Sequence, residues 1–94
     1  MSDQTNLLIH ALAIHAEKPG RVRARVTVRL GDPAPGDRVR FEGVDRVARK
    51  LEIVDIKLTS RLSTIVLTGT EEDLQHLVGG TYLYGEERNI KRDG

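Results

Sequence analysis

The sequence predicts an all-β fold, a small closed six-stranded β-barrel with one short helical turn near residues 70–78. Three observations predict it. One long segment alternates strictly between polar and apolar residues, several short segments are rich in β-branched residues, and Gly or Pro separates these segments. The 94 residues are enough for one domain, with an expected core over residues 6–85 and a flexible tail over residues 86–94.

The clearest strand pattern runs from Arg21 to Leu30 without a break. Successive side chains of a strand point to opposite faces, so a two-residue period predicts one face in the core. The inward face is expected to hold Val22, Ala24, Val26, Val28 and Leu30. The outward face is expected to hold Thr27 and the arginines Arg21, Arg23, Arg25 and Arg29.

Further strands follow along the chain. Residues 31–37 contain two prolines and two glycines, which predicts a turn, and residues 38–42 resume the alternation. Residues 47–58 form a long strand whose apolar residues change parity at Ile53 and Val54, which indicates a β-bulge there. A β-branched segment over residues 63–68 predicts another strand.

The later part of the chain predicts the helical turn and a last strand. Thr70 followed by three acidic residues is typical of a helix start, and paired glycines at positions 79 and 80 would end the turn. Residues 81–84 then form a strand. Residues 6–16 fit two patterns: a helical stripe, or a strand with alternate residues on one side. The helical stripe would consist of Leu8, Leu12 and His15, and the strand side of Leu8, His10, Leu12 and Ile14.

Three stretches together are similar to a known family. They are Pro19 to Val28, Ala34 to Phe41, and Ile65 to Leu83 with the acidic turn inside it. In order and spacing they resemble the β-barrel second domain of translational GTPases such as elongation factor Tu. This resemblance covers Leu7 to Gly85 and implies a barrel with a strand over residues 6–16.

The resemblance does not extend to GTP chemistry. No Gly-x-x-x-x-Gly-Lys-Ser/Thr motif occurs, so no GTP binding is expected. The family often has Arg where Thr68 stands, so its contact with aminoacyl-tRNA is not transferred to any residue here.

The composition predicts neither an enzyme nor a metal or cofactor site. The chain has no Cys and only three scattered His residues, and no activated nucleophile or facing carboxylate pair is visible. No apolar run is long enough to span a bilayer and no secretory signal is visible, so no membrane contact and a cytoplasmic location are expected.

Charge is unevenly distributed. Residues 17–50 contain ten basic and five acidic residues, whereas residues 51–94 contain five basic and eight acidic ones. Arginines two apart on a strand are about 6.5–7 Å apart, close to the phosphate spacing of an extended nucleic acid, and their guanidinium groups bind phosphate bidentately. The candidate nucleic-acid-binding residues are Arg21, Arg23, Arg25, Arg29, Arg38 and Arg40, the last two widening the row from the following strand.

Two functions therefore follow as hypotheses. The first is a non-catalytic binding module that contacts RNA or a ribonucleoprotein through this arginine-rich face. The second is a protein-interaction or structural module of a larger assembly without nucleic acid, in which the arginines pair with acids such as Glu42, Glu52 and Asp55. Tyr82 and Tyr84 could stack on bases, but with only three aromatic residues in the chain they are expected to seal one side of the barrel.

Overall fold

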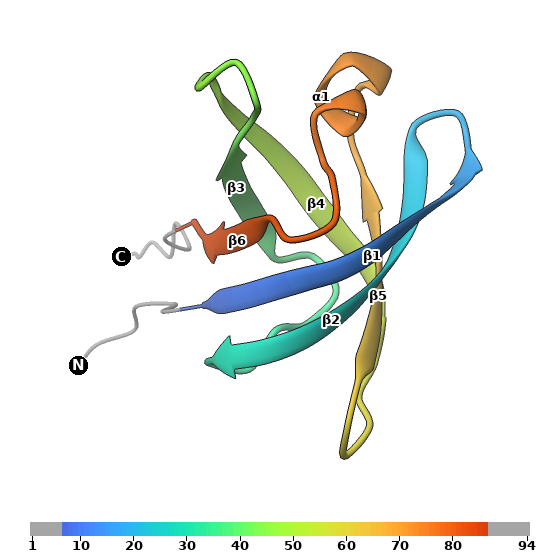
Figure 1. Ribbon diagram of the computed structural model, residues 1–94. Helices are drawn as coiled ribbons and strands as arrows, with labels where there is room; N and C mark the ends of the chain where they lie inside the picture. Colours follow the sequence, from blue (N-terminus) through green and yellow to red (C-terminus); the bar gives the residue numbers. More distant parts are fainter. Residues whose placement is uncertain (1–6, 87–94) are drawn as a thin grey trace, which may run out of the picture.

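The computed structural model describes residues 7–86, which fold into a closed antiparallel β-barrel of six strands (Figure 1). The elements are β1 (Leu8–Lys18), β2 (Arg21–Leu30), β3 (Arg38–Glu42), β4 (Ala48–Lys57), β5 (Ser63–Thr68), α1 (Glu71–Gln75) and β6 (Tyr82–Gly85). Around the barrel the strands follow the order β1-β2-β5-β4-β3-β6. The predicted all-β fold is confirmed. No helix in the described part of the chain is long and apolar enough to cross a membrane.

The core is the barrel interior, filled from every strand by alternate side chains. Its largest fully buried side chains are Phe41, Ile9, Ile53, Ile65, Leu67, Leu83, Val26 and Val39. On β2 the predicted inward residues Val22, Ala24 and Val26 are all buried. The two-residue period therefore locates the core correctly over the first half of β2.

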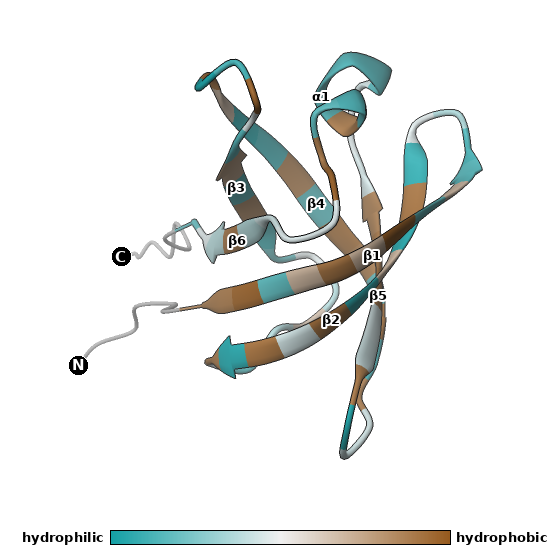
Figure 2. Cartoon of the chain, in the orientation of Figure 1, coloured by the Kyte–Doolittle hydropathy of each residue, from teal (hydrophilic) through white to brown (hydrophobic). Residues whose placement is uncertain are grey.

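The ambiguous segment at the start of the chain is a strand, and its inward side is Leu7, Ile9 and Ala11. Its pairing with β2 shifts between Ala11 and Ala13, so a bulge reverses the inward side and lets Ile14 pack against the core. No single parity holds along β1, and the expected four-residue side is wrong. Figure 2 shows apolar residues along most of β1.

The end of β2 also departs from strict alternation. Leu30 is 54% exposed instead of buried, and Val28 is only half-buried against the core. The β1–β2 pairing passes from Leu8–Leu30 to Ile9–Val28, so Arg29 is an extra residue on β2. This irregularity turns Leu30 to the outer surface.

The bulge predicted in β4 is present. Ile53 pairs with Leu67 and Asp55 pairs with Val66, so Val54 is the extra residue. The parity change in the sequence is therefore the local signature of a real register shift.

The α1 turn begins at the predicted cap. The Thr70 Oγ1 accepts a hydrogen bond from the Asp73 N–H at 3.1 Å, as an N-cap residue does. The helix is shorter than residues 70–78, since it ends at Gln75. Leu74 and Leu77 turn toward the core, so α1 covers one end of the barrel (Figure 1).

Position 86, expected to belong to the tail, is held by the barrel. The Glu86 N–H donates to the Arg38 carbonyl at 2.9 Å, and the Glu86 carboxylate pairs with Lys50 at 3.0 Å, so Glu86 belongs to the barrel. The rest of the expected tail, residues 87–94, and position 6 of the expected core lie outside the described residues.

Candidate nucleic-acid interface

Barrel topology divides the predicted arginine row between distant strands. Strands β2 and β3 are not neighbours: β5 and β4 separate them on one side, and β1 and β6 on the other. Arg38 and Arg40 therefore do not widen the row on β2, and that part of the prediction is wrong. Strands that are consecutive in sequence neighbour each other often but not always, and this barrel joins β2 to β3 across its end.

Near the β1–β2 hairpin one β2 arginine is already paired and another is only half-exposed. Arg23 forms an ion pair with Glu17, a contact within the hairpin that the sequence analysis did not identify. Arg21 is only half-exposed, and its Nε is buried with no hydrogen-bond partner in the described part of the chain. This end of the row offers less free positive charge than the sequence pattern predicts.

Four of the predicted arginines remain exposed and form no ion pair with any carboxylate in residues 7–86. They are Arg25, Arg29, Arg38 and Arg40. The acids Glu42, Glu52 and Asp55, considered above as partners, form no ion pair with them. Their guanidinium groups are therefore available to a ligand.

Both tyrosines of β6 lie on the outside of the barrel. Tyr82 is 39% exposed and Tyr84 is 50% exposed, while Leu83 between them is fully buried. The expectation that the tyrosines seal the barrel is wrong, because the alternation of β6 gives its inward position to Leu83.

Tyr82 stacks on His10 of the neighbouring strand β1. The ring centroids are 4.3 Å apart and the planes differ by 5°. Neighbouring strands are separated by about 4.8 Å, so two parallel rings this close stand upright from the sheet instead of lying flat on it. A further flat ring would have to extend this stack from one of its ends.

The outer surface of three adjacent strands gathers these residues. We call it the β6–β1–β2 face, and it holds two rows of paired residues that continue from strand to strand. The rows are Tyr84, Leu8 and Leu30, and Tyr82, His10 and Thr27. Its centre is aromatic and apolar, and Figure 1 shows β6, β1 and β2 side by side.

Three of the free arginines border the β6–β1–β2 face. Arg40 of β3 pairs directly with Tyr84. Arg25 is the next outward residue of β2 after Thr27, and Arg29 is the bulged residue beside Leu30. Arg38 lies farther off, opposite Glu52 of β4.

Sequence reasoning did not identify Leu8, His10 and Leu30 as surface residues of this face. Apolar residues on both sides of residues 7–14 were the available signal. A strand with one solvated face would have polar residues on that face.

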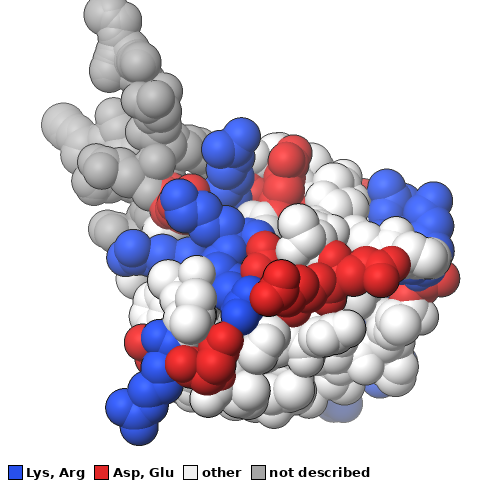
Figure 3. Space-filling view, turned by 90° about the horizontal axis from the view of Figure 1, so that it is seen from above, with Lys and Arg blue, Asp and Glu red and all other residues white. Residues whose placement is uncertain are grey.

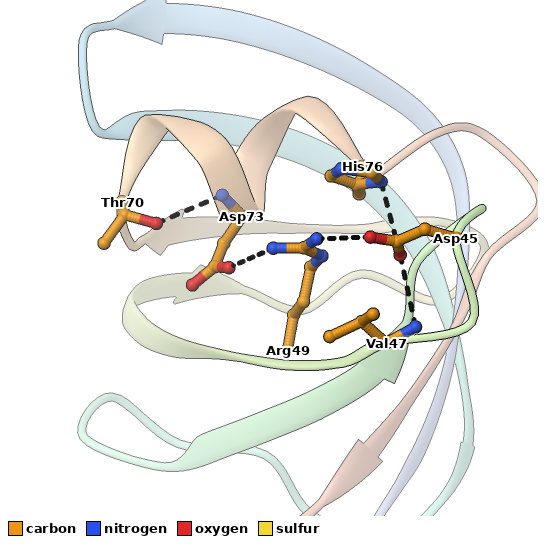
Figure 4. A network of polar contacts seen from close by, with 6 residues as sticks. All are labelled: Asp45, Val47, Arg49, Thr70, Asp73 and His76. Atoms are coloured by element: carbon orange, nitrogen blue, oxygen red, sulfur yellow. Dashed lines mark hydrogen bonds and ion pairs between the residues drawn. The ribbon is translucent and has the colours of Figure 1, made fainter.

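A polar cluster centred on Arg49 lies beside α1 and the β3–β4 turn (Figure 4). Arg49 points inward and its side chain is only 9% exposed. Its Nη1 donates to Asp73 Oδ1 at 2.8 Å and its Nη2 to Asp45 Oδ2 at 2.6 Å. One guanidinium group thus ties β4 to the β3–β4 turn and to α1, and its role is structural.

The contacts within the cluster favour the charged forms of Asp45 and Arg49. Burial by itself would raise the pKa of Asp45, but hydrogen bonds from the Arg49 side chain and the Val47 N–H, with the charge of Arg49, outweigh it and lower that pKa. Hydrogen bonds to Asp73 and Asp45 raise the pKa of Arg49. His76 Nδ1 lies 3.7 Å from Asp45 Oδ1.

The His, Asp and Glu side chains of residues 7–86 could bind a metal ion only where several of them lie together. Nowhere in residues 7–86 do three His, Asp or Glu side chains gather as a metal ion would require. Figure 3 shows acidic and basic side chains mixed on the end of the barrel that α1 covers. The β6–β1–β2 face, by contrast, combines aromatic side chains with three arginines that have no ion-pair partner in residues 7–86.

Comparisons with known proteins do not extend this description. No protein-family model, no curated protein and no solved structure matches the chain.

Proposed function

We propose that this protein is a non-catalytic module that binds single-stranded RNA, free or within a ribonucleoprotein, on the β6–β1–β2 face. The observation that supports it most is the position of Arg25, Arg29 and Arg40, unpaired with acids in residues 7–86, around the outward tyrosines. The proposed RNA contact lies on the three strands β6, β1 and β2 instead of on β2 alone. A cytoplasmic location belongs to the same proposal.

The dimensions of the face suit an extended strand of nucleotides. From Arg40 on β3 to Leu30 on β2, beside Arg29, there are three strand intervals, or about 14 Å. Two phosphate spacings of an extended strand cover about the same distance, so phosphates could reach guanidinium groups at both edges while the bases between them meet apolar and aromatic side chains.

A duplex fits this face less well. Its bases are stacked inside the helix and cannot extend the stack of His10 and Tyr82, whereas unpaired bases can. The chain as a whole has a net charge of only +1, so we expect modest affinity, with Kd on the order of micromolar at physiological salt.

Charge reversal at two edges of the face tests the proposal. The variant Arg25→Glu/Arg40→Glu should fold normally, because both side chains are exposed, and should bind a 12-nucleotide single-stranded RNA about tenfold or more weakly. The matched control is Arg46→Glu/Arg61→Glu, which changes net charge equally at exposed turn positions. Fluorescence anisotropy measures both. Equal loss in the two variants, or no binding by the native protein, would refute the proposal.

A protein ligand on the same face is the second candidate. Leu30 and Tyr84 are half-exposed, and apolar and aromatic side chains rimmed by Arg are typical of protein interfaces. Purification from the native host with and without nuclease separates the two functions. A protein partner that survives nuclease treatment and is lost in Leu30→Glu would favour this candidate.

A further inference from the structure

A groove lies at the end of the barrel remote from the cross-strand pair of Tyr84 and Leu8. One wall is the β1–β2 hairpin and the other is α1, which Figure 1 shows next to each other. The groove has a volume of about 440 Å³, within the range of protein ligand pockets, and its lining is mainly apolar. The apolar lining residues are Ala16, Pro19, Val22 and Leu74.

The geometry of the two strands explains why this groove stays open. Ala16 and Val22 oppose each other across the hairpin, on the side that faces the core lower down the same strands. Among residues 7–86, α1 alone covers this side above the core, and with five residues it is too short to fill the space. Apolar surface that belongs to the inner side of the barrel therefore remains accessible.

The two walls are joined by their backbones. The Gly69 N–H, just before α1, donates to the Gly20 carbonyl in the hairpin turn at 3.2 Å. Gly20 has a φ of +81°, which any other residue would adopt only with strain. The groove is thus formed before a ligand arrives, and binding would not require ordering of its walls.

Carboxylates on both walls indicate what the groove would accept. Glu17 lies on the hairpin wall, where it pairs with Arg23, and Glu71 lies on the helix wall without an ion-pair partner in residues 7–86. Lys18 is the one basic residue in the lining. Glu72, next to Glu71, is also exposed and has no ion-pair partner in residues 7–86. These charges repel phosphate and attract Lys or Arg.

We infer that this groove is a docking site for a peptide segment of a partner protein that has an apolar side chain flanked by basic residues. The apolar side chain would lie against Ala16 and Leu74, and the basic ones would pair with Glu71 and Glu72. The groove and the β6–β1–β2 face lie at opposite ends of β1 and β2, so one chain could hold RNA and a protein together.

A pair of synthetic peptides tests the inference on the whole chain. The first, Gly-Lys-Leu-Leu-Lys-Gly, should bind and shift the backbone amide signals of Gly20, Leu74 and Gln75 in NMR titrations. The second has Glu in place of each Lys and should bind at least about tenfold more weakly. No binding of the first peptide at about 1 mM, equal binding of the two, or shifts located elsewhere would each overturn the inference.

Two variants locate the contact. Ala16→Arg adds bulk and positive charge at an exposed position of the groove, and Glu71→Lys reverses one wall. Each should weaken the first peptide about tenfold, while Glu52→Lys, an exposed residue of β4 outside the lining, serves as the matched control. Equal peptide binding by native protein and Ala16→Arg would overturn the inference. The Ala16→Arg variant should bind RNA as the native protein does, so the two proposals can fail separately.

Discussion

The salt dependence of RNA binding gives the sharpest quantitative prediction. If Arg25, Arg29 and Arg40 each neutralise one phosphate, the logarithm of the association constant should fall against the logarithm of salt concentration with a slope of about −2, since each phosphate in a single strand contributes about −0.7. Raising KCl from about 50 to 200 mM should then weaken binding of the native protein about 18-fold.

Variants that neutralise one arginine each measure the contribution of that arginine to the salt dependence. In Arg25→Gln, Arg29→Gln or Arg40→Gln the slope should change to about −1.4, so the same salt step weakens binding only about sevenfold. In the triple variant the slope should be close to zero. Fluorescence anisotropy with a labelled 12-nucleotide RNA at several KCl concentrations measures all of these slopes.

Two further arginines serve as internal controls. Arg23→Gln should change the slope less than Arg25→Gln, because the Glu17 carboxylate already neutralises Arg23. Arg61→Gln, in the exposed β4–β5 turn, should not change the slope. A native slope near zero, or equal slope changes in Arg61→Gln and Arg25→Gln, would refute the assignment of phosphate contacts to this face.

The remaining predictions concern stability, measured by urea unfolding. Thr70→Ala removes the acceptor for the Asp73 N–H and should lower the free energy of unfolding by about 1 kcal/mol, while Thr70→Ser should retain most of it. Phe41→Ala, at a side chain that is 2% exposed, should cost about 3–5 kcal/mol, and Phe41→Leu clearly less. Because the pKa of Asp45 is lower in the folded protein than its ordinary value of 3.8, its ionised form stabilises the fold above about pH 3.8. That contribution is lost as the pH falls through the folded pKa, so the stability difference between the native protein and Asp45→Asn should shrink below pH 4.

Each stability prediction has an outcome that contradicts it. A Thr70→Ser variant as unstable as Thr70→Ala would show that the hydroxyl does not cap α1. A cost below about 1 kcal/mol for Phe41→Ala would mean that this side chain does not fill the barrel. A stability difference between the native protein and Asp45→Asn that grows as the pH falls below 4 would contradict a lowered pKa of Asp45. The matched control for Asp45→Asn is Asp32→Asn, which removes a carboxylate from an exposed turn.

Local features of the fold were predictable from local sequence. The alternation on β2 predicts the burial of Val22, Ala24 and Val26, because side-chain direction in a strand depends only on position along it. The parity change at Ile53 predicts the bulge of β4, and Thr70 before an acidic triplet predicts the start of α1. Each of these features depends on residues that are close together in the sequence.

Features of the candidate site depended on partners distant in sequence. Closure of the barrel separates Arg40 from the β2 arginines and places it beside Tyr84 instead, since neighbours in a barrel follow from strand order and not from chain order. The shift opposite Arg29 turns Leu30 outward, and a register shift exists only between two strands. Composition and alternation therefore determine that this chain forms a barrel, whereas pairing across the barrel determines which side chains share a surface.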